Sequence, residues 1–122
     1  MTRILYVDDE ADIREVAEMA LELDPDFEVA LAAGGAEAIG KARDWTPDLI
    51  LLDVMMPGMD GPAVFAKLKE DAATARIPVV FITARTQAQD VAGFRALGAR
   101  GVLAKPFDPM TLAGQVRELL DD

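Results

Sequence analysis

Carboxylate, hydroxyl and ammonium side chains directly follow four of the five short apolar runs in this sequence. Asp8-Asp9-Glu10 comes after the first run, Asp53 after the third, Thr83 after the fourth and Lys105 after the fifth. Grouped aspartates form a hard oxygen site that suits Mg²⁺. An aspartate can also act as a nucleophile and form an acyl phosphate, whose oxygens a cation and a hydroxyl would stabilise. If a fold gathers these side chains, they could carry out phosphoryl transfer.

Each of these residues also has an ordinary structural interpretation. Asp9 or Glu10 could simply cap the following helix, Thr83 could be a loop or capping hydroxyl, and Lys105 could be a solvated surface lysine. These interpretations explain the residues one at a time, but not why all of them follow apolar runs. Clustered carboxylates also destabilise a fold unless a cation neutralises them. We therefore favour a functional site.

The composition excludes several other kinds of chemistry. The chain has 122 residues, no Cys and no His, and its 22 acidic against 12 basic residues give a formal charge of −10. This length fits one domain. Without Cys or His there is no disulfide, thiolate zinc site, catalytic triad or phosphohistidine. The charge disfavours direct binding to nucleic acid or an anionic membrane, and no targeting segment is visible, so we expect a cytoplasmic protein.

The five apolar runs predict the strands that would position these groups. Ile4–Val7, Leu49–Leu52 and Val79–Ile82 are unbroken, which is typical of parallel strands covered on both faces. Phe27–Leu31 contains one charge and indicates a strand nearer an edge. Gly101–Ala104 is a weaker fifth candidate.

Amphipathic stretches alternate with these runs and predict five helices. Their apolar faces include Val16 in the first helix and Leu97 in the fourth. Asp60 is a candidate N-cap for the third helix, Thr86–Gln89 matches a capping box that would open the fourth, and Asp108-Pro109 would open the last.

The alternation of strands and helices predicts an α/β fold, a doubly wound (βα)5 unit. Its parallel sheet would carry helices on both faces and right-handed crossovers. Ligands of such sheets bind at the carboxyl ends of the strands. The reactive side chains named above are therefore predicted to meet at one rim of the sheet.

Four segments resemble the receiver domain of two-component response regulators: Leu5–Glu10, Leu51–Gly61, Ile82–Ala84 and Lys105–Phe107. The resemblance covers essentially the whole chain, which we expect to form one receiver domain over residues 1–122. It implies a flavodoxin-like five-stranded sheet in the order 2-1-3-4-5, an order known from a chemotaxis receiver.

The resemblance implies a phosphoacceptor and a metal site. Asp53 would accept a phosphoryl group from the phosphohistidine of a sensor kinase or a histidine phosphotransfer protein. Asp9 would bind Mg²⁺ directly and Asp8 partly through water, with Mn²⁺ as a substitute metal. Asp53 and the backbone carbonyl of Met55 would complete the protein ligands.

The resemblance also implies residues that sense the phosphoryl group. Thr83 and Lys105 would bind its oxygens, and the small Ala84 would leave its position accessible. Lys105-Pro106 resembles the cis peptide bond of the family. Val102 is a departure, because the family usually has an aromatic residue there, and a valine cannot report phosphorylation by rotating a ring.

The implied activity is that of a switch, which catalyses its own phosphorylation and dephosphorylation and is otherwise not an enzyme. Phosphorylation would change the face of the fourth helix and fifth strand and so the affinity for an unknown downstream protein. The last helix ends near Leu120, so we expect a stand-alone regulator, either a monomer or a phosphorylation-dependent dimer. A receiver excised from a longer regulator is the alternative.

Three other protein classes fit less well. A haloacid-dehalogenase-like phosphatase has its nucleophile after the first strand and a second Asp two residues on, where this chain has Glu10, and there is no room for a cap domain. A flavodoxin-like cofactor binder would need a phosphate loop where Asp8-Asp9-Glu10 would repel phosphate. A receiver that signals without phosphate is disfavoured by the full set of Asp9, Asp53, Thr83 and Lys105.

Overall fold

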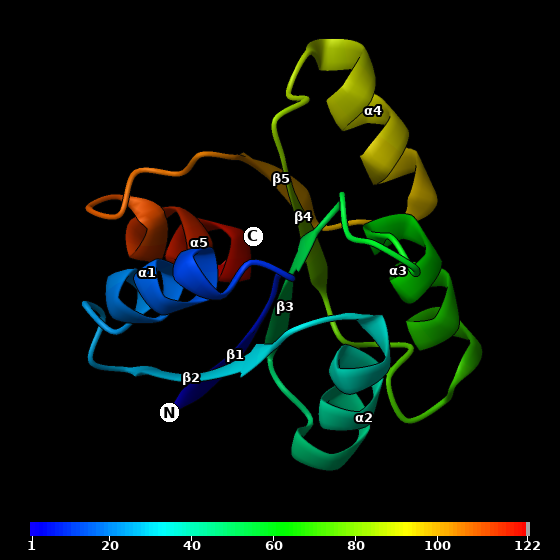
Figure 1. Cartoon of the computed structure of the whole chain (residues 1–122), viewed down its shortest axis with the longest axis horizontal. Coiled ribbons are helices and arrows are strands. Elements are labelled where there is room, and N and C mark those ends of the chain that lie inside the picture. Colours follow the sequence, from blue (N-terminus) through cyan, green and yellow to red (C-terminus); the bar gives the residue numbers. More distant parts are fainter. Residues whose placement is uncertain (122) are drawn as a thin grey trace.

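The computed structural model describes residues 1–121, in which five strands alternate with five helices (Figure 1). Asp122, the last residue of the predicted domain, lies outside the described residues. In chain order the elements are β1 (Thr2–Val7), α1 (Ala11–Leu21), β2 (Phe27–Ala32), α2 (Gly35–Trp45), β3 (Leu49–Asp53), α3 (Gly61–Glu70), β4 (Val79–Thr83), α4 (Ala88–Leu97), β5 (Gly101–Ala104) and α5 (Leu112–Asp121).

The strands form one parallel sheet in the order β2-β1-β3-β4-β5, as the resemblance implied. Strand order reverses beside β1, whose neighbours are β2 and β3. The crevice outside the carboxyl ends of β1 and β3 is therefore the position where such a sheet binds ligands. The edge position predicted for the second strand is confirmed, since β2 pairs only with β1.

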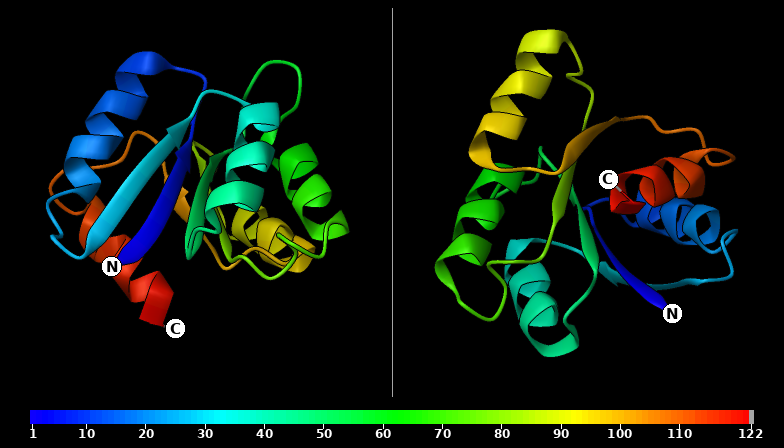
Figure 2. Two further views of the ribbon diagram at one scale, coloured as in Figure 1. Left: turned by 90° about the horizontal axis from the view of Figure 1, so that it is seen from below. Right: turned by 180° about the vertical axis from the view of Figure 1, so that it is seen from behind.

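The helices cover both faces of the sheet and create two hydrophobic cores. Helices α1 and α5 lie on one face, and α2, α3 and α4 lie on the other (Figures 1 and 2). Leu21 and Val116 pack against Ile4 and Leu51 on the first face. Phe65 and Phe81 are central to the second core. The sheet is thus a rigid platform, buried on both sides.

Strand boundaries differ slightly from the prediction, with a consequence for the site. Asp53 and Thr83 are the last residues of β3 and β4 rather than the first residues after them. Asp53 pairs with Ile82 of β4, and Thr83 pairs with Ala104 of β5. The backbone at Asp53 and Thr83 is therefore held by the sheet and not by a mobile loop.

The start signals of the helices were correct in one case and wrong in two. Asp60 caps α3 as predicted, since its carboxylate accepts a hydrogen bond from Ala63 N at 2.9 Å. The capping box at Thr86–Gln89 is wrong, because α4 begins at Ala88 and no side chain caps it. Helix α5 begins at Leu112, one turn later than predicted.

The reason for the late start of α5 lies in the segment before it. The carboxylate of Asp108 accepts a hydrogen bond from Met110 N at 2.9 Å, which closes a local turn. Asp108 therefore stabilises a turn that leads into the helix, and does not cap its first residue.

Two apolar residues predicted to face the core are exposed. Val16 of α1 is 36% exposed and Leu97 of α4 is 54% exposed. None of the residues of α4 is buried, so this helix packs against the sheet less tightly than the others do. No helix within residues 1–121 is long and apolar enough to cross a membrane.

Candidate functional site

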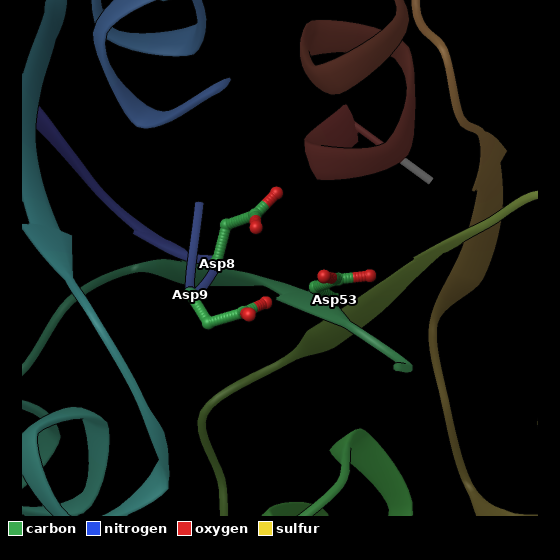
Figure 3. A group of neighbouring side chains, drawn as sticks. All are labelled: Asp8, Asp9 and Asp53. Atoms are coloured by element: carbon green, nitrogen blue, oxygen red, sulfur yellow. The ribbon is translucent and has the colours of Figure 1, made fainter. Parts of the chain in front are cut away.

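Three aspartates meet at the carboxyl end of the sheet. Asp8 and Asp9 follow β1, and Asp53 ends the neighbouring strand β3, so their side chains lie around one space (Figure 3). One carboxylate oxygen from each residue lies within 4.8 Å of the other two. Asp8 and Asp53 are buried, whereas Asp9 is exposed. The predicted convergence of these residues is confirmed.

Lys105 holds the two buried carboxylates together. Its Nζ donates to Asp8 Oδ2 at 3.0 Å and to Asp53 Oδ2 at 3.1 Å. The alternative of a solvated surface lysine is therefore wrong. Burial alone would lower the pKa of Lys105, but its hydrogen bonds to Asp8 and Asp53 outweigh this effect and raise it. Lys105 is thus a firmly charged ammonium that bridges two strand ends.

Burial raises the pKa of the Asp53 carboxyl group, and the hydrogen bond from Lys105 only partly offsets this. The carboxylate of Asp8 also raises it by repulsion. Asp53 is 3% exposed. The site therefore holds a carboxylate whose negative charge is only partly compensated, and which a further cation would stabilise.

Every oxygen of the Asp8 carboxylate has a donor. Oδ1 accepts from the backbone N of Glu10 at 3.0 Å, and Oδ2 accepts from the hydroxyl of Tyr6 at 3.1 Å as well as from Lys105. Arg14 donates to the backbone carbonyl of Asp8 at 2.8 Å. Glu10 occupies the N-cap position of α1, but its side chain makes no capping bond. Asp8 is therefore fixed from several directions.

Thr83 has a local structural role at the end of β4. Its hydroxyl is buried and accepts a hydrogen bond from Arg85 N at 3.0 Å, which fits the loop or capping interpretation. Thr83 also borders a hollow of about 460 Å³ that Met55 and Phe94 help to line. Thr83 thus lies beside a hollow at the carboxyl end of β4.

The remaining predicted residues surround this rim. Met55 donates its backbone N–H to Asp53 Oδ1 over a long 3.4 Å, and its side chain is exposed. Ala84 is exposed and Val102 is partly buried. The peptide bond between Lys105 and Pro106 is cis, as the resemblance implied.

Two residues at the site were not identified from the sequence. Tyr6 lies in an apolar run, and the only signal was that a buried tyrosine hydroxyl needs a hydrogen-bond partner. Burial, reinforced by Asp8, raises the pKa of the Tyr6 hydroxyl far above its usual value, so it remains a donor. At Gly61, a Cβ atom would lie 2.7 Å from the backbone oxygen of Asp53. Only glycine allows this close approach of α3 to the end of β3.

Residues 4–117 match the family model of the response regulator receiver domain. The chain belongs to this family. The receiver fold extends slightly beyond the matched residues, because β1 begins at Thr2 and α5 continues to Asp121. Family membership favours a receiver over the phosphatase and the flavodoxin-like binder considered above.

Known proteins similar to this receiver domain include regulators of several bacteria. It is 43% identical over 118 residues to the response regulator Rre1 of Synechocystis, covering 96% of this chain and 51% of that protein. It is 46% identical over 119 residues to PleD of Caulobacter vibrioides, covering 96% and 26%. The chain thus spans about half the length of the first relative and about a quarter of the second.

The fold is also that of solved receiver structures. The chemotaxis response regulator CheY4 of Vibrio cholerae superposes with a TM-score of 0.88 at 34% identity, covering 98% of both chains. Receiver domains are the signalling switches of two-component systems, and they act with histidine kinases or phosphotransfer proteins and with downstream targets. This chain carries such a domain.

The acidic residues of this receiver domain could hold a metal ion. Three carboxylates face the single ammonium of Lys105, which leaves two negative charges uncompensated among these groups. The donors are all oxygens, and the chain contains no His or Cys that would favour a softer metal. This donor set fits a hard divalent cation.

Proposed function

We propose that this receiver domain is a Mg²⁺-dependent phosphoacceptor and that Asp53 accepts the phosphoryl group. The observation that carries the proposal is the position of the Asp53 carboxylate. It lies at the end of β3, accepts a hydrogen bond from Lys105 and lies close to the carboxylates of Asp8 and Asp9. A nucleophile, a cation that binds phosphoryl oxygens and a metal site therefore occupy one small volume.

The proposed reaction is a transfer from nitrogen to oxygen. An Asp53 carboxylate oxygen forms a bond to phosphorus, the N–P bond of a phosphohistidine breaks, and the departing imidazole takes up a proton from water. Lys105 then binds a phosphoryl oxygen, and the hydroxyl of Thr83 binds another. The switch is reset by hydrolysis: a water oxygen forms a bond to phosphorus, the Asp53 O–P bond breaks, inorganic phosphate leaves and the Asp53 carboxylate is restored.

The proposed metal ligands are Asp9, Asp53 and the backbone carbonyl of Met55, with Asp8 acting through water. Both oxygens of the Asp8 carboxylate already accept hydrogen bonds at 3.0–3.1 Å, which supports its acting through water, whereas the exposure of Asp9 supports direct binding. Bound Mg²⁺ would neutralise the charge that accumulates on the transferring group.

The phosphoryl donor and the target both lie outside this receiver domain in this proposal. The chain contains no histidine, so the phosphohistidine belongs to a sensor kinase or a histidine phosphotransfer protein. The phosphoryl group draws Thr83 and Ala84 toward Asp53 and shifts α4, which changes the surface offered to a downstream protein. Helix α4 suits this role because it buries no residue and packs through the half-buried Phe94 against Phe81, with ring centroids 4.9 Å apart.

Incubation with acetyl phosphate tests this function without knowledge of the partner. With Mg²⁺ present we expect one phosphoryl group per chain, measured as a mass increase of the intact protein. The adduct should be lost in hydroxylamine, which cleaves acyl phosphates. Chelation of Mg²⁺ should reduce the labelling rate by at least about a hundredfold, because several kcal/mol of charge stabilisation is removed. Equal labelling in excess chelator would contradict the proposed role of the metal.

A further inference from the structure

The hydroxyl of Tyr6 is a buried polar group that the proposed reaction does not use. Tyr6 is the only tyrosine of the chain, and its Oη donates to Asp8 Oδ2 at 3.1 Å. Lys105 Nζ donates to the same oxygen at 3.0 Å. One carboxylate oxygen therefore has two donors, of which one is neutral and fixed and the other is charged and shared with Asp53.

The two donors differ in their freedom to move. The Tyr6 side chain is fully buried within β1, and its ring meets that of Phe107 edge to face, with centroids 6.3 Å apart. Lys105 lies in the loop after β5, and its side chain is 21% exposed. A phosphoryl group on Asp53 would attract the Lys105 ammonium, whereas Tyr6 would stay in place.

We propose that Tyr6 is a positioning residue, whose hydroxyl keeps the buried Asp8 carboxylate oriented and hydrogen-bonded when Lys105 moves from Asp8 to the phosphoryl group on Asp53. Asp8 has no exposed surface, and a buried carboxylate that loses a charged partner is strongly destabilised. The Tyr6 hydroxyl limits that cost and so favours the phosphorylated state. This inference rests on the proposed function of Asp53.

The test compares Tyr6→Phe with the wild-type protein before and after addition of beryllium fluoride and Mg²⁺, which mimic a phosphoryl group on a carboxylate. Before addition, Lys105 still donates a hydrogen bond to Asp8, so Tyr6→Phe should lower Tm only slightly. After addition, the increase in Tm should be about 4 °C smaller in the variant, because one hydrogen bond to a charged group is missing. An increase equal to that of the wild-type protein would overturn the inference.

Thr74→Val is the matched control. The Thr74 hydroxyl is also buried and donates to Leu68 O at 2.6 Å, and Thr74 lies in the segment that leads into the amino end of β4, whereas the site lies at the carboxyl ends of the strands. This variant should have a lower Tm before addition, but its increase in Tm with beryllium fluoride should equal that of the wild-type protein. A reduced increase in both variants would assign the effect to general destabilisation and overturn the positioning role.

A second comparison needs no phosphoryl group and separates the two proposals. In a Lys105→Met background Tyr6 is the remaining side-chain donor to Asp8 Oδ2, so Tyr6→Phe should lower Tm about twice as much as in the wild-type background. If this coupling is found but acetyl phosphate does not label the wild-type protein, the proposed function fails and the Tyr6–Asp8 bond stands. If labelling occurs and no coupling is found, the positioning role alone fails.

Discussion

Lys105→Met should lower the free energy of unfolding by about 2–3 kcal/mol at pH 7. The substitution keeps most of the side-chain volume but removes the ammonium that lies 3.0 Å from Asp8 and 3.1 Å from Asp53. Removing one partner of a buried ion pair costs about 3–5 kcal/mol, and the partial exposure of Lys105 reduces this value. Urea denaturation at pH 7 measures the loss.

The pH dependence of this loss follows from the two carboxylates left behind. Burial raises the pKa of Asp53 and the hydrogen bond from Lys105 lowers it, so without Lys105 this pKa rises further in the folded protein, which then binds more protons than the unfolded state as pH falls. The difference in the free energy of unfolding between Lys105→Met and the wild-type protein should therefore decrease as pH falls from 7 to 5. Lys67→Met is the control, because Lys67 forms an exposed pair with Glu70 at 4.0 Å and its substitution should cost under about 0.5 kcal/mol. Equal losses in both variants would show that the bridge does not stabilise the fold.

Gly61→Ala should destabilise the protein by about 3 kcal/mol or more and also impair phosphoryl transfer. The new Cβ atom would lie 2.7 Å from the backbone oxygen of Asp53 and 2.9 Å from Cα of Val54. Backbone atoms cannot yield as a flexible side chain does, so either α3 moves away or the end of β3 shifts. Both the midpoint of urea denaturation and the rate of labelling by acetyl phosphate should fall.

Gly40→Ala provides the control for the Gly61 substitution. Gly40 lies inside α2, and apart from the backbone of its own helix no atom lies within 4 Å of the Cβ atom that alanine would add. Alanine there should stabilise the helix by about 0.5–1 kcal/mol. If Gly61→Ala is as well tolerated as Gly40→Ala, the close approach of α3 to Asp53 does not constrain the site.

The strands could be predicted from the sequence because their burial is continuous. Unbroken apolar runs such as Leu49–Leu52 have few alternatives to a covered parallel strand. The start of α4 was predicted wrongly, because Thr86–Gln89 fits a capping box by residue type alone. Whether such a box forms depends on the backbone path into the helix, and that path is set by tertiary contacts.

The site was predictable to the extent that it depends on topology. Parallel strands end at one edge, so the neighbouring strands β1 and β3 bring Asp8 and Asp53 together, and Lys105 is placed at the same edge by β5. The contacts of Tyr6 and Gly61 could not be predicted in this way. Each depends on a distance of a few ångströms between a residue and atoms of another segment, which periodicity and spacing do not determine.

The location of the phosphoryl group after labelling tests the central claim most directly. After acetyl phosphate labelling and borohydride trapping, peptide mass mapping should place the modification on Asp53, and Asp53→Asn should acquire none. This variant should remain folded, because asparagine replaces a buried carboxylate by a neutral amide. Burial disfavours the charged form of Asp53, as the raised pKa of its carboxyl group shows. Modification of Asp8 or Asp9, or equal labelling of Asp53→Asn and the wild-type protein, would contradict the assignment of Asp53 as the phosphoacceptor.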